Sequence, residues 1–335
     1  MSTLQRPVLI IGGSGVVGGQ AAAALRRLQF DLPIAIGGRD LAKAQVVAQK
    51  VGRAIATRVD LDRRDLGQPE GAQYSAIVVF VKDDGLNSMR YAQDHGIPYI
   101  SVSSGTFEIG PEVAQFIHAA TKAPVLLASQ WLAGAAVFPA LVFAKDFRTI
   151  DSIAIGALLD EQDMGGPAAL TDYNRITGAA PAALTLTGGK FSWVNGEDAK
   201  ARYRSVDGVE LEATAYSPLD IVSLAAVTNA RSVRLDLAFS ESASRRRGEP
   251  FSTEITIAID GVLRNGERST MRHEIVHPDG QAPLTALGVA LAVERMLGLA
   301  GGAAPQPGLY LPESILDPDY YVGHMREFGA QFRQT

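Results

Sequence analysis

The chain has 335 residues, which is enough for two domains with full hydrophobic cores. Apolar residues make up 47% of it and charged residues 20%, the proportions of a globular protein and not of a disordered one. The net charge of −5 offers no basic field to nucleic acid, and the absence of cysteine excludes disulfides, thiolate nucleophiles and cysteine zinc sites.

The N-terminal sequence MSTLQRPVLII lacks the basic head and apolar core of a signal peptide, so we expect a cytoplasmic protein. The uncharged run 125–144, VLLASQWLAGAAVFPALVFA, is long enough to span a bilayer. Gln130, Gly134 and Pro139 interrupt this run, and a strand–helix rhythm leads into it. We therefore interpret it as a buried strand followed by a buried helix, and expect no membrane partner.

Short apolar segments alternate with helical patterns through the first third of the chain. The expected strands are 7–11, 33–37, 54–60, 76–80, 98–102 and 124–128. The expected helices are 16–28, 41–51, 86–95 and 111–121. This alternation indicates an α/β domain with a parallel sheet covered on both faces, the doubly wound Rossmann arrangement.

After residue 151 the pattern changes. The segments SIAIGAL, RSVRLDLAF, FSTEITIAI and STMRHEIVH favour strands, with little helix between the later ones. They predict a second α+β domain built on a mixed or antiparallel sheet. A strong helix pattern follows at 284–298, and a short helix is expected near the C-terminus. The stretch SESASRRRGEP is typical of a loop, and we expect its arginines in solvent.

A glycine-rich turn lies between the first expected strand and helix, where a dinucleotide pyrophosphate binds in doubly wound domains. The candidate phosphate-binding residues are Gly13, Ser14, Gly15, Val16, Val17 and Gly18. They match G-x-G-x-x-G in the required strand–turn–helix context. Gly12, Gly15 and Gly18 also match G-x-x-G-x-x-G, the spacing of extended short-chain dehydrogenases, whose Tyr-x-x-x-Lys pair is absent from the chain. The competing interpretation is a glycine bend without a ligand.

The end of the second strand, IAIGGRD, favours NADP over NAD. A NAD enzyme usually carries an acidic residue here to hold the ribose 2′-hydroxyl, whereas this chain has Gly37 and Gly38 followed by Arg39. Glycine leaves room for a 2′-phosphate, and an arginine can pair with it. Asp40 is expected to cap the next helix. An ordinary surface arginine is the alternative for Arg39.

Three further residues are expected at the carboxyl ends of strands, where ligands bind in such sheets. Asp60 is expected near the adenine, and Phe80 and Lys82 near the nicotinamide ribose. Lys82 is also the first candidate for a catalytic proton donor, because a desolvated lysine can give up a proton at neutral pH. A solvated loop lysine is the alternative.

The chain resembles the saccharopine dehydrogenase-like (saccharopine reductase) NADP-binding oxidoreductases. The segments that carry this resemblance are VLIIGGSGVVGG, IAIGGRDLAKA, VVFVKDDGLNSMRYAQDHGIPYISVSSG, VLLASQWLAGAAVFPALVFA, LTALGVALAVERMLG and GLYLPESILDPDYYVGHMREFG. The resemblance implies an NADP-binding domain at 1–129, a substrate domain at 130–280, and C-terminal helices at 281–335 that return to the first domain.

Two segments depart from the family pattern. The acidic residue that usually follows the fifth strand is replaced by Ser103 and Ser104, and the turn after the sixth strand reads Gln-Trp-Leu-Ala-Gly at 130–134. A cationic or zwitterionic amino-acid substrate would need those carboxylates. Their absence argues against saccharopine itself as the substrate.

Other candidates for chemistry lie after residue 130. Tyr173 and Arg175 offer a hydrogen-bond donor and a clamp for a carboxylate, or else an exposed pair on a helix. Trp131 is a candidate pocket wall or a core residue. His273 and His277 share one face of a strand, but without further ligands nearby they do not predict a metal site.

Together these features predict an NADP-dependent oxidoreductase that transfers a hydride to or from a small carbonyl, imine or amino-acid-like substrate. The alternatives are a non-catalytic NADP(H) sensor and an enoyl reductase that works with a partner. A homodimer is an open option, since two-fold dimers are the commonest assemblies.

Overall fold

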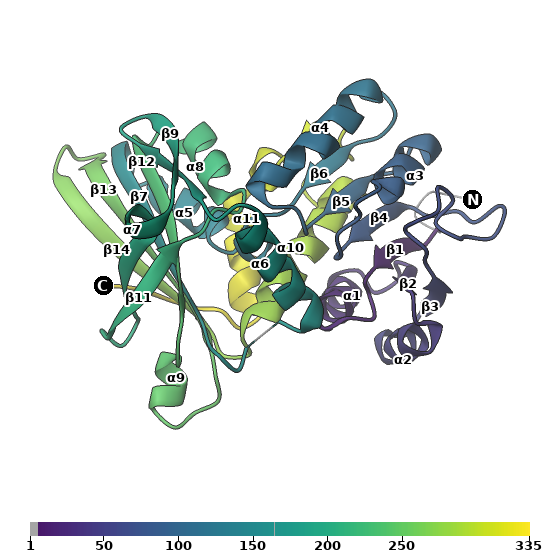
Figure 1. Cartoon of the computed structure of the whole chain (residues 1–335), viewed down its shortest axis with the longest axis horizontal. Coiled ribbons are helices and arrows are strands. Elements are labelled where there is room, and N and C mark those ends of the chain that lie inside the picture. Colours follow the sequence, from purple (N-terminus) through teal and green to yellow (C-terminus); the bar gives the residue numbers. More distant parts are fainter. Residues whose placement is uncertain (1–5, 164) are drawn as a thin grey trace. The chain divides into compact units, whose positions relative to one another are not determined.

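The computed structural model describes residues 6–163 and 165–335, which form two compact units (Figure 1). The first unit contains the chain up to Ser129 together with Thr285–Asp317. The second contains Gln130–Leu284 and Pro318–Thr335. The return of residues 281–335 to the first unit is therefore limited to the segment that ends at Asp317. Residues 1–5, on which part of the signal-peptide prediction rests, lie outside the described residues.

The first unit is built on a parallel sheet. Its described strands are β1 (Val8–Ile11), β2 (Ile34–Gly38), β3 (Ala54–Arg58), β4 (Ala76–Val79), β5 (Tyr99–Ser101), β6 (Val125–Leu127) and β15 (Leu309–Tyr310). Their order is β15-β6-β5-β4-β1-β2-β3, and each described pair is parallel. All residues of β1, β2, β4, β5 and β6 are buried, which explains why the sequence shows short continuous apolar runs there and not alternation.

The longer helices of this unit lie close to the predicted positions, and the 3-10 turns are additional. They are α1 (Val16–Leu28), α2 (Leu41–Val51), α3 (Asn87–His95), the 3-10 turn η2 (Thr106–Glu108), α4 (Ile109–His118), most of α10 (Gln281–Met296) and the 3-10 turn η4 (Pro312–Ser314). The Asp40 carboxylate accepts a hydrogen bond from the Lys43 N–H at 3.1 Å, so the predicted cap of α2 is confirmed. With its strand order, this is the predicted doubly wound domain.

The second unit is built on a mixed sheet. Its described strands are β7 (Phe147–Leu159), β8 (Ala183–Thr187), β9 (Lys190–Val194), β10 (Lys200–Arg204), β11 (Glu210–Ala215), β12 (Ser232–Phe239), β13 (Thr253–Leu263), β14 (Arg268–His277) and β16 (Gln331–Gln334). The main order is β10-β11-β12-β7-β13-β14-β16, and β8 joins β12 to β9. The β7–β12 pair is parallel and the other described pairs are antiparallel. The predicted α+β character is confirmed.

The helices of the second unit include several that the sequence pattern did not reveal. They are the 3-10 turn η3 (Trp131–Gly134), α5 (Val137–Ala144), α6 (Pro167–Ala179), α7 (Gly196–Ala199), α8 (Asp220–Thr228), α9 (Ala243–Arg246) and α11 (Pro318–Glu327). The Tyr321 ring on α11 stacks on Phe138 of α5 at 4.0 Å, and β16 pairs with β14, which ties the C-terminal residues to this unit. Within the described ranges, no helix has the length and apolar character needed to cross a membrane.

The arginine-rich stretch differs from its predicted exposure. The Arg245 side chain is only 16% exposed and lies 3.2 Å from Asp160, which is fully buried. Arg246 contacts Asp207 through two nitrogens, each at 2.7 Å from an oxygen. Only Arg247, at 54% exposure, is a solvent-facing residue of the expected kind. Two of the three arginines therefore hold α9 in place by ion pairs.

Candidate functional site

The glycine turn between β1 and α1 is so closely packed that it excludes side chains at its first two positions. Gly12 has φ +82°, a conformation that favours glycine. A Cβ on Gly13 would lie 2.7 Å from the carbonyl oxygen of Ile10. The backbone therefore requires glycine at both position 12 and position 13. The G-x-x-G-x-x-G pattern that starts at Gly12 and the G-x-G-x-x-G pattern that starts at Gly13 describe the same turn.

The start of α1 packs directly on this turn. A Cβ on Gly18 would lie 2.4 Å from the carbonyl oxygen of Gly12, so only glycine allows the helix to approach this closely. Gly15 is the N-cap residue, and no side chain caps the helix. Gly15 and Val16 are exposed. The first turn of α1 thus presents backbone N–H groups and the positive end of the helix dipole, which favour an anionic ligand.

The end of β2 lies beside the same turn. A Cβ on Gly38 would lie 2.9 Å from the Ser14 hydroxyl, so a larger residue here would displace Ser14. Arg39 follows directly and is exposed. An acidic residue is absent from the end of β2, and Asp40 is engaged in capping α2.

Phe80 and Asp60 occupy different surroundings. Phe80 is 9% exposed, and its Cβ would lie 3.1 Å from a Cβ on Gly12, so it packs behind the glycine turn. Asp60 is partly exposed and accepts a hydrogen bond from the Asp62 N–H at 3.1 Å. Asp60 therefore shapes the loop that follows β3, and its proximity to an adenine stays a prediction.

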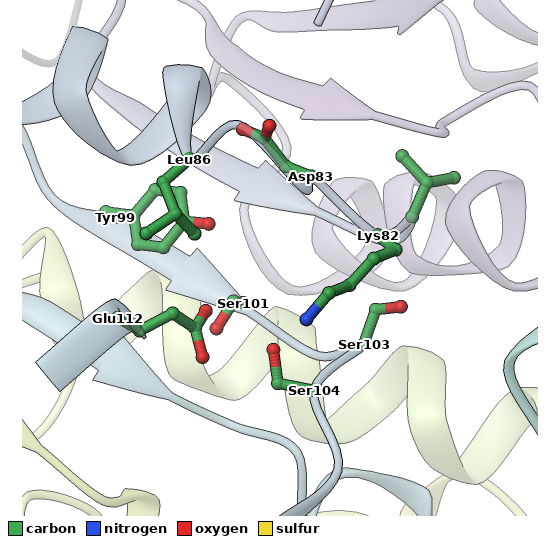
Figure 2. A pocket seen from close by; sticks show the side chains of 9 residues that line it. Lys82, Asp83, Leu86, Tyr99, Ser101, Ser103, Ser104 and Glu112 are labelled. Atoms are coloured by element: carbon green, nitrogen blue, oxygen red, sulfur yellow. The ribbon is translucent and has the colours of Figure 1, made fainter. Parts of the chain in front are cut away.

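Lys82 lies in a pocket at the carboxyl ends of β4 and β5 (Figure 2). This narrow, partly open pocket is lined by residues that include Lys82, Tyr99, Ser101, Ser104 and Glu112. The Lys82 side chain is 21% exposed, so it is not a freely solvated loop lysine. Its Nζ lies 3.6 Å from the Oε2 of Glu108.

Glu112 is a pocket residue that the sequence interpretation missed. It lies in the first turn of α4 and is 2% exposed. Burial raises the pKa of its carboxyl, while the neighbouring Ser101 and Ser104 hydroxyls and the Lys82 charge oppose this rise. Its Oε2 atom is buried and accepts no hydrogen bond of normal geometry from the described residues.

Glu108 and Glu112 supply carboxyl groups to the region where the family acid after the fifth strand is missing. Their spacing of four residues, directly after the strand-five loop, is the sequence signal that could have revealed them, because residues i and i+4 share one helix face. Here η2 carries Glu108 and α4 carries Glu112, so the geometry is a 3-10 turn that continues into a helix. Glu108 and Glu112 are thus carboxyl groups of the kind whose absence after the fifth strand argued against saccharopine itself as the substrate.

Asp83 and Tyr99 form another part of the pocket wall, and both contact Ser88. Asp83 accepts hydrogen bonds from the Ser88 N–H at 2.7 Å and the Ser88 hydroxyl at 2.5 Å. The Ser88 hydroxyl also lies 3.4 Å from the hydroxyl of Tyr99. Tyr99 is buried, and burial raises its pKa well above the usual range. Tyr99 therefore stays neutral and serves as a wall of the pocket.

The second unit brings two of its three predicted site residues into one aromatic cluster. The Trp131 ring contacts Tyr216 edge-on at 5.7 Å, and the Tyr173 ring lies 6.0 Å from Tyr216. Burial raises the pKa of Tyr216, and Arg175, two residues after Tyr173 on α6, lies near enough to this cluster for its charge to oppose that rise. Its Nη2 forms an ion pair with Asp172 at 3.0 Å.

The backbone at Trp131 is unusual. Leu132 and Ala133 both have positive φ angles, +47° and +54°, which cost free energy for residues other than glycine. The carboxylate of Asp220 accepts a hydrogen bond from the Trp131 N–H at 2.6 Å, and the Gln130 amide donates to Ser223 at 2.8 Å. Contacts with α8 thus hold this strained turn and position Trp131.

His273 and His277 have structural contacts. The His273 ring stacks on Phe143 at 3.7 Å, and the Nε2 of His277 lies 3.1 Å from the carbonyl oxygen of Phe328. Burial lowers the pKa of both rings. A search of the described segments finds no group of three or more side chains able to hold a metal ion.

No protein-family model matches the chain, and no curated protein matches it either. Among solved structures, apo saccharopine dehydrogenase (L-Glu forming) from Saccharomyces cerevisiae superposes with a TM-score of 0.70. The match covers 98% of this chain and 100% of that one, at 13% identity. The chain has the fold of saccharopine dehydrogenase. The fold that the sequence resemblance implied is therefore confirmed.

Two further matches are weaker. A myo-inositol dehydrogenase from Corynebacterium glutamicum has a TM-score of 0.47 and 12% identity, with 98% of both chains covered. An oxidoreductase from Agrobacterium radiobacter in complex with NAD+, L-tartaric acid and magnesium has a TM-score of 0.48 and 12% identity, with 96% of both chains covered. Both are too distant to extend the comparison beyond saccharopine dehydrogenase.

Proposed function

We propose that the protein is an NADP-dependent oxidoreductase that transfers a hydride to or from a small carbonyl, imine or amino-acid-like substrate. The observation that carries the proposal is the turn between β1 and α1. Its backbone leaves no room for side chains at Gly12, Gly13 and Gly18, and the start of α1 is left uncapped and exposed. This is the geometry that a dinucleotide pyrophosphate requires. The fold of saccharopine dehydrogenase supports it.

The residues at the end of β2 support NADP as the cofactor. Gly38 leaves space beside Ser14, and the exposed guanidinium of Arg39 can pair with the two charges of a 2′-phosphate. The turn residues Gly15, Val16 and Val17 would hold the pyrophosphate through their N–H groups. When bound, the nicotinamide supplies or accepts the hydride.

The chain's own residues then bind the substrate and move a proton. Lys82 lies at the carboxyl end of β4 in a partly enclosed pocket, where its ammonium can exchange a proton with a substrate oxygen or nitrogen. For the second unit, taken by itself, Trp131 stays a predicted apolar wall, the Tyr173 hydroxyl a predicted hydrogen-bond donor and Arg175 a predicted carboxylate clamp. A homodimer and a cytoplasmic location belong to the same proposal.

Titration of the purified protein with NADPH and, separately, NADH tests the cofactor assignment through nucleotide fluorescence. Tight binding of NADPH with weak binding of NADH is expected. A panel of small carbonyls, imines and activated alkenes with NADPH then tests turnover. Binding without any turnover would indicate a dinucleotide sensor, and reduction of the alkenes alone would indicate an enoyl reductase. Absence of binding would overturn the proposal.

A further inference from the structure

The two carboxyl groups near Lys82 differ in their surroundings. Glu108 accepts a hydrogen bond from the Gly105 N–H at 2.8 Å with the same oxygen that lies 3.6 Å from the Lys82 Nζ. Such contacts suit a carboxylate. Glu112, one turn further along, has a buried Oε2 that accepts no hydrogen bond of normal geometry within the described residues. When two neighbouring carboxyl groups have such different surroundings, one is commonly protonated while the other is charged.

The position of Glu112 connects it to Lys82. In Figure 2 the hydroxyls of Ser101 and Ser104 lie between the Nζ of Lys82 and the carboxyl of Glu112. Both hydroxyls favour the charged form of Glu112, as the Lys82 ammonium does, which places all three groups within interaction range of the carboxyl. Serine hydroxyls both donate and accept hydrogen bonds, so they can pass a proton between an acid and an amine.

We propose that Glu112 is a proton reservoir for Lys82: it holds a proton on a buried carboxyl of the pocket lining and returns one to Lys82 during each turnover. The proposal rests on the proposed function, since it assumes that Lys82 protonates the substrate. Glu112 does not contact the reacting atoms, so it acts through Lys82. Glu108 remains the charged partner that orients the Lys82 ammonium.

The proton balance is complete in the reducing direction. As a hydride and its electron pair reach the substrate carbon, the π electrons of the C=O or C=N bond move to the oxygen or nitrogen. That atom takes a proton from Lys82, so an Nζ–H bond breaks and an O–H or N–H bond forms. Glu112 then gives its carboxyl proton to the Ser104 hydroxyl, which passes its own proton to Nζ. The resulting carboxylate regains a proton from water.

The other ionisable groups around Glu112 agree with this assignment. Lys82 acts on it from the segment after β4, Tyr99 from β5 and Glu108 from η2, while Asp83 lines the same pocket and accepts hydrogen bonds from Ser88. Lys82 is the only cation of this group. The negative charge of Glu108 opposes ionisation of Glu112. Because Glu108 is charged, a second negative charge at Glu112 is disfavoured. Glu112 therefore keeps its proton until Lys82 has given one to the substrate.

The first experiment measures the protonation state directly, without turnover. Infrared difference spectra of wild type against Glu112→Gln at pH 7 should show a protonated carboxyl band that the variant loses. Glu70→Gln, which changes an exposed carboxylate, should leave the band unchanged. Lys82→Met should shift the band, because the neighbouring charge is removed. Absence of the band from wild type would overturn the proposal, whatever the protein's activity.

The second experiment is a double-mutant cycle on turnover. Lys82→Met should lower kcat by about 10²- to 10⁴-fold, as expected for loss of a general acid. Glu112→Gln should lower kcat by about tenfold in wild type, and by less than about twofold in the K82M background, because residues that act as one unit are not additive. An equal loss in both backgrounds would show that Glu112 has only a structural role.

Two further measurements separate this proposal from the proposed function. NADPH affinity should be unchanged in Glu112→Gln. Wild-type protein that binds NADPH but shows no carboxyl band would refute only the reservoir. If Glu112→Gln fails to fold, Glu112→Asp replaces it: this variant keeps a carboxyl group and should keep the infrared band, with kcat between those of wild type and Lys82→Met. Loss of the band in Glu112→Asp would count against the reservoir.

Discussion

Gly18 lies directly against the carbonyl oxygen of Gly12, so that a Cβ on Gly18 would approach this oxygen to 2.4 Å. The contact joins the first turn of α1 to the end of β1 and sets the angle at which the helix N-terminus leaves the sheet. Backbone atoms form both sides of the contact. No side-chain rotation can therefore relieve a larger residue at position 18.

Gly18→Ala should lower the free energy of unfolding by about 1–3 kcal/mol, since the added methyl group forces a backbone shift. It should also weaken NADPH binding, because the N–H groups of the turn move with the helix. Urea unfolding and nucleotide titration measure the two effects. Gly19→Ala is the matched control: its Cβ would meet its nearest atom at 3.5 Å, an ordinary contact, and alanine favours the helix by about 1 kcal/mol. Equal behaviour of the two variants would contradict the packing argument.

Arg39→Ala should weaken NADPH binding by about 10- to 100-fold, the effect of losing a charge-assisted hydrogen bond of about 1.5–3 kcal/mol. NADH lacks the 2′-phosphate, so its affinity should stay unchanged. Arg39→Lys keeps the charge without the two-pronged geometry and should fall between wild type and Arg39→Ala. Fluorescence titrations with both nucleotides provide the measurement. A parallel loss for NADPH and NADH would refute the role of Arg39.

Tyr173→Phe removes one hydroxyl and keeps the ring contact with Phe239 at 5.0 Å. If Tyr173 donates a hydrogen bond to the substrate, kcat/KM should fall by about 10²-fold while NADPH affinity stays constant. Tyr216→Phe in the same aromatic cluster is the control, because burial raises the pKa of Tyr216 well above its usual range and no step is assigned to it. Steady-state kinetics with the best substrate of the panel measure kcat/KM for both variants and wild type. Unchanged kinetics in Tyr173→Phe would limit Tyr173 to packing.

The ion pair between Arg246 and Asp207 should make the protein sensitive to acid. The Arg246 guanidinium lowers the pKa of Asp207 below its usual range. Because the folded-state pKa lies below the unfolded value of about 3.9, the stabilisation is present above pH 4 and is lost as the pH falls. Arg246→Met should therefore lower the unfolding free energy by about 1–2 kcal/mol at pH 7, and by less at pH 3.

Arg247→Met is the control for this ion pair. Arg247 and Glu249 are each 54% exposed, so solvent screens their pair and it should contribute little at either pH. Urea unfolding at pH 7 and pH 3 compares the variants with wild type. A loss in Arg246→Met that is independent of pH would mean that the arginine stem packs without the carboxylate pair.

The local sequence predicted the first unit well, because its elements carry their own signals. Continuous apolar runs mark the buried strands, and Asp40 marks the start of α2. The second unit was less predictable. Its short strands β9 to β11 are partly exposed and lie close together in the chain, so neither period nor hydrophobicity distinguishes them from loops. The burial of Arg245 was missed because its partner Asp160 is distant in sequence.

The sequence by itself determined the doubly wound domain, the glycine turn and the end of β2, because the residues that define each feature are neighbours in the chain. Only the tertiary structure decided which residues surround Lys82. Glu112 carries no local signal of burial, since a glutamate in the first turn of a helix is ordinarily a solvated residue. Its environment comes from β4, β5 and α4, which meet only in the folded sheet. Burial and charge depend on these contacts, and so does the protonation state that the proposed reservoir requires.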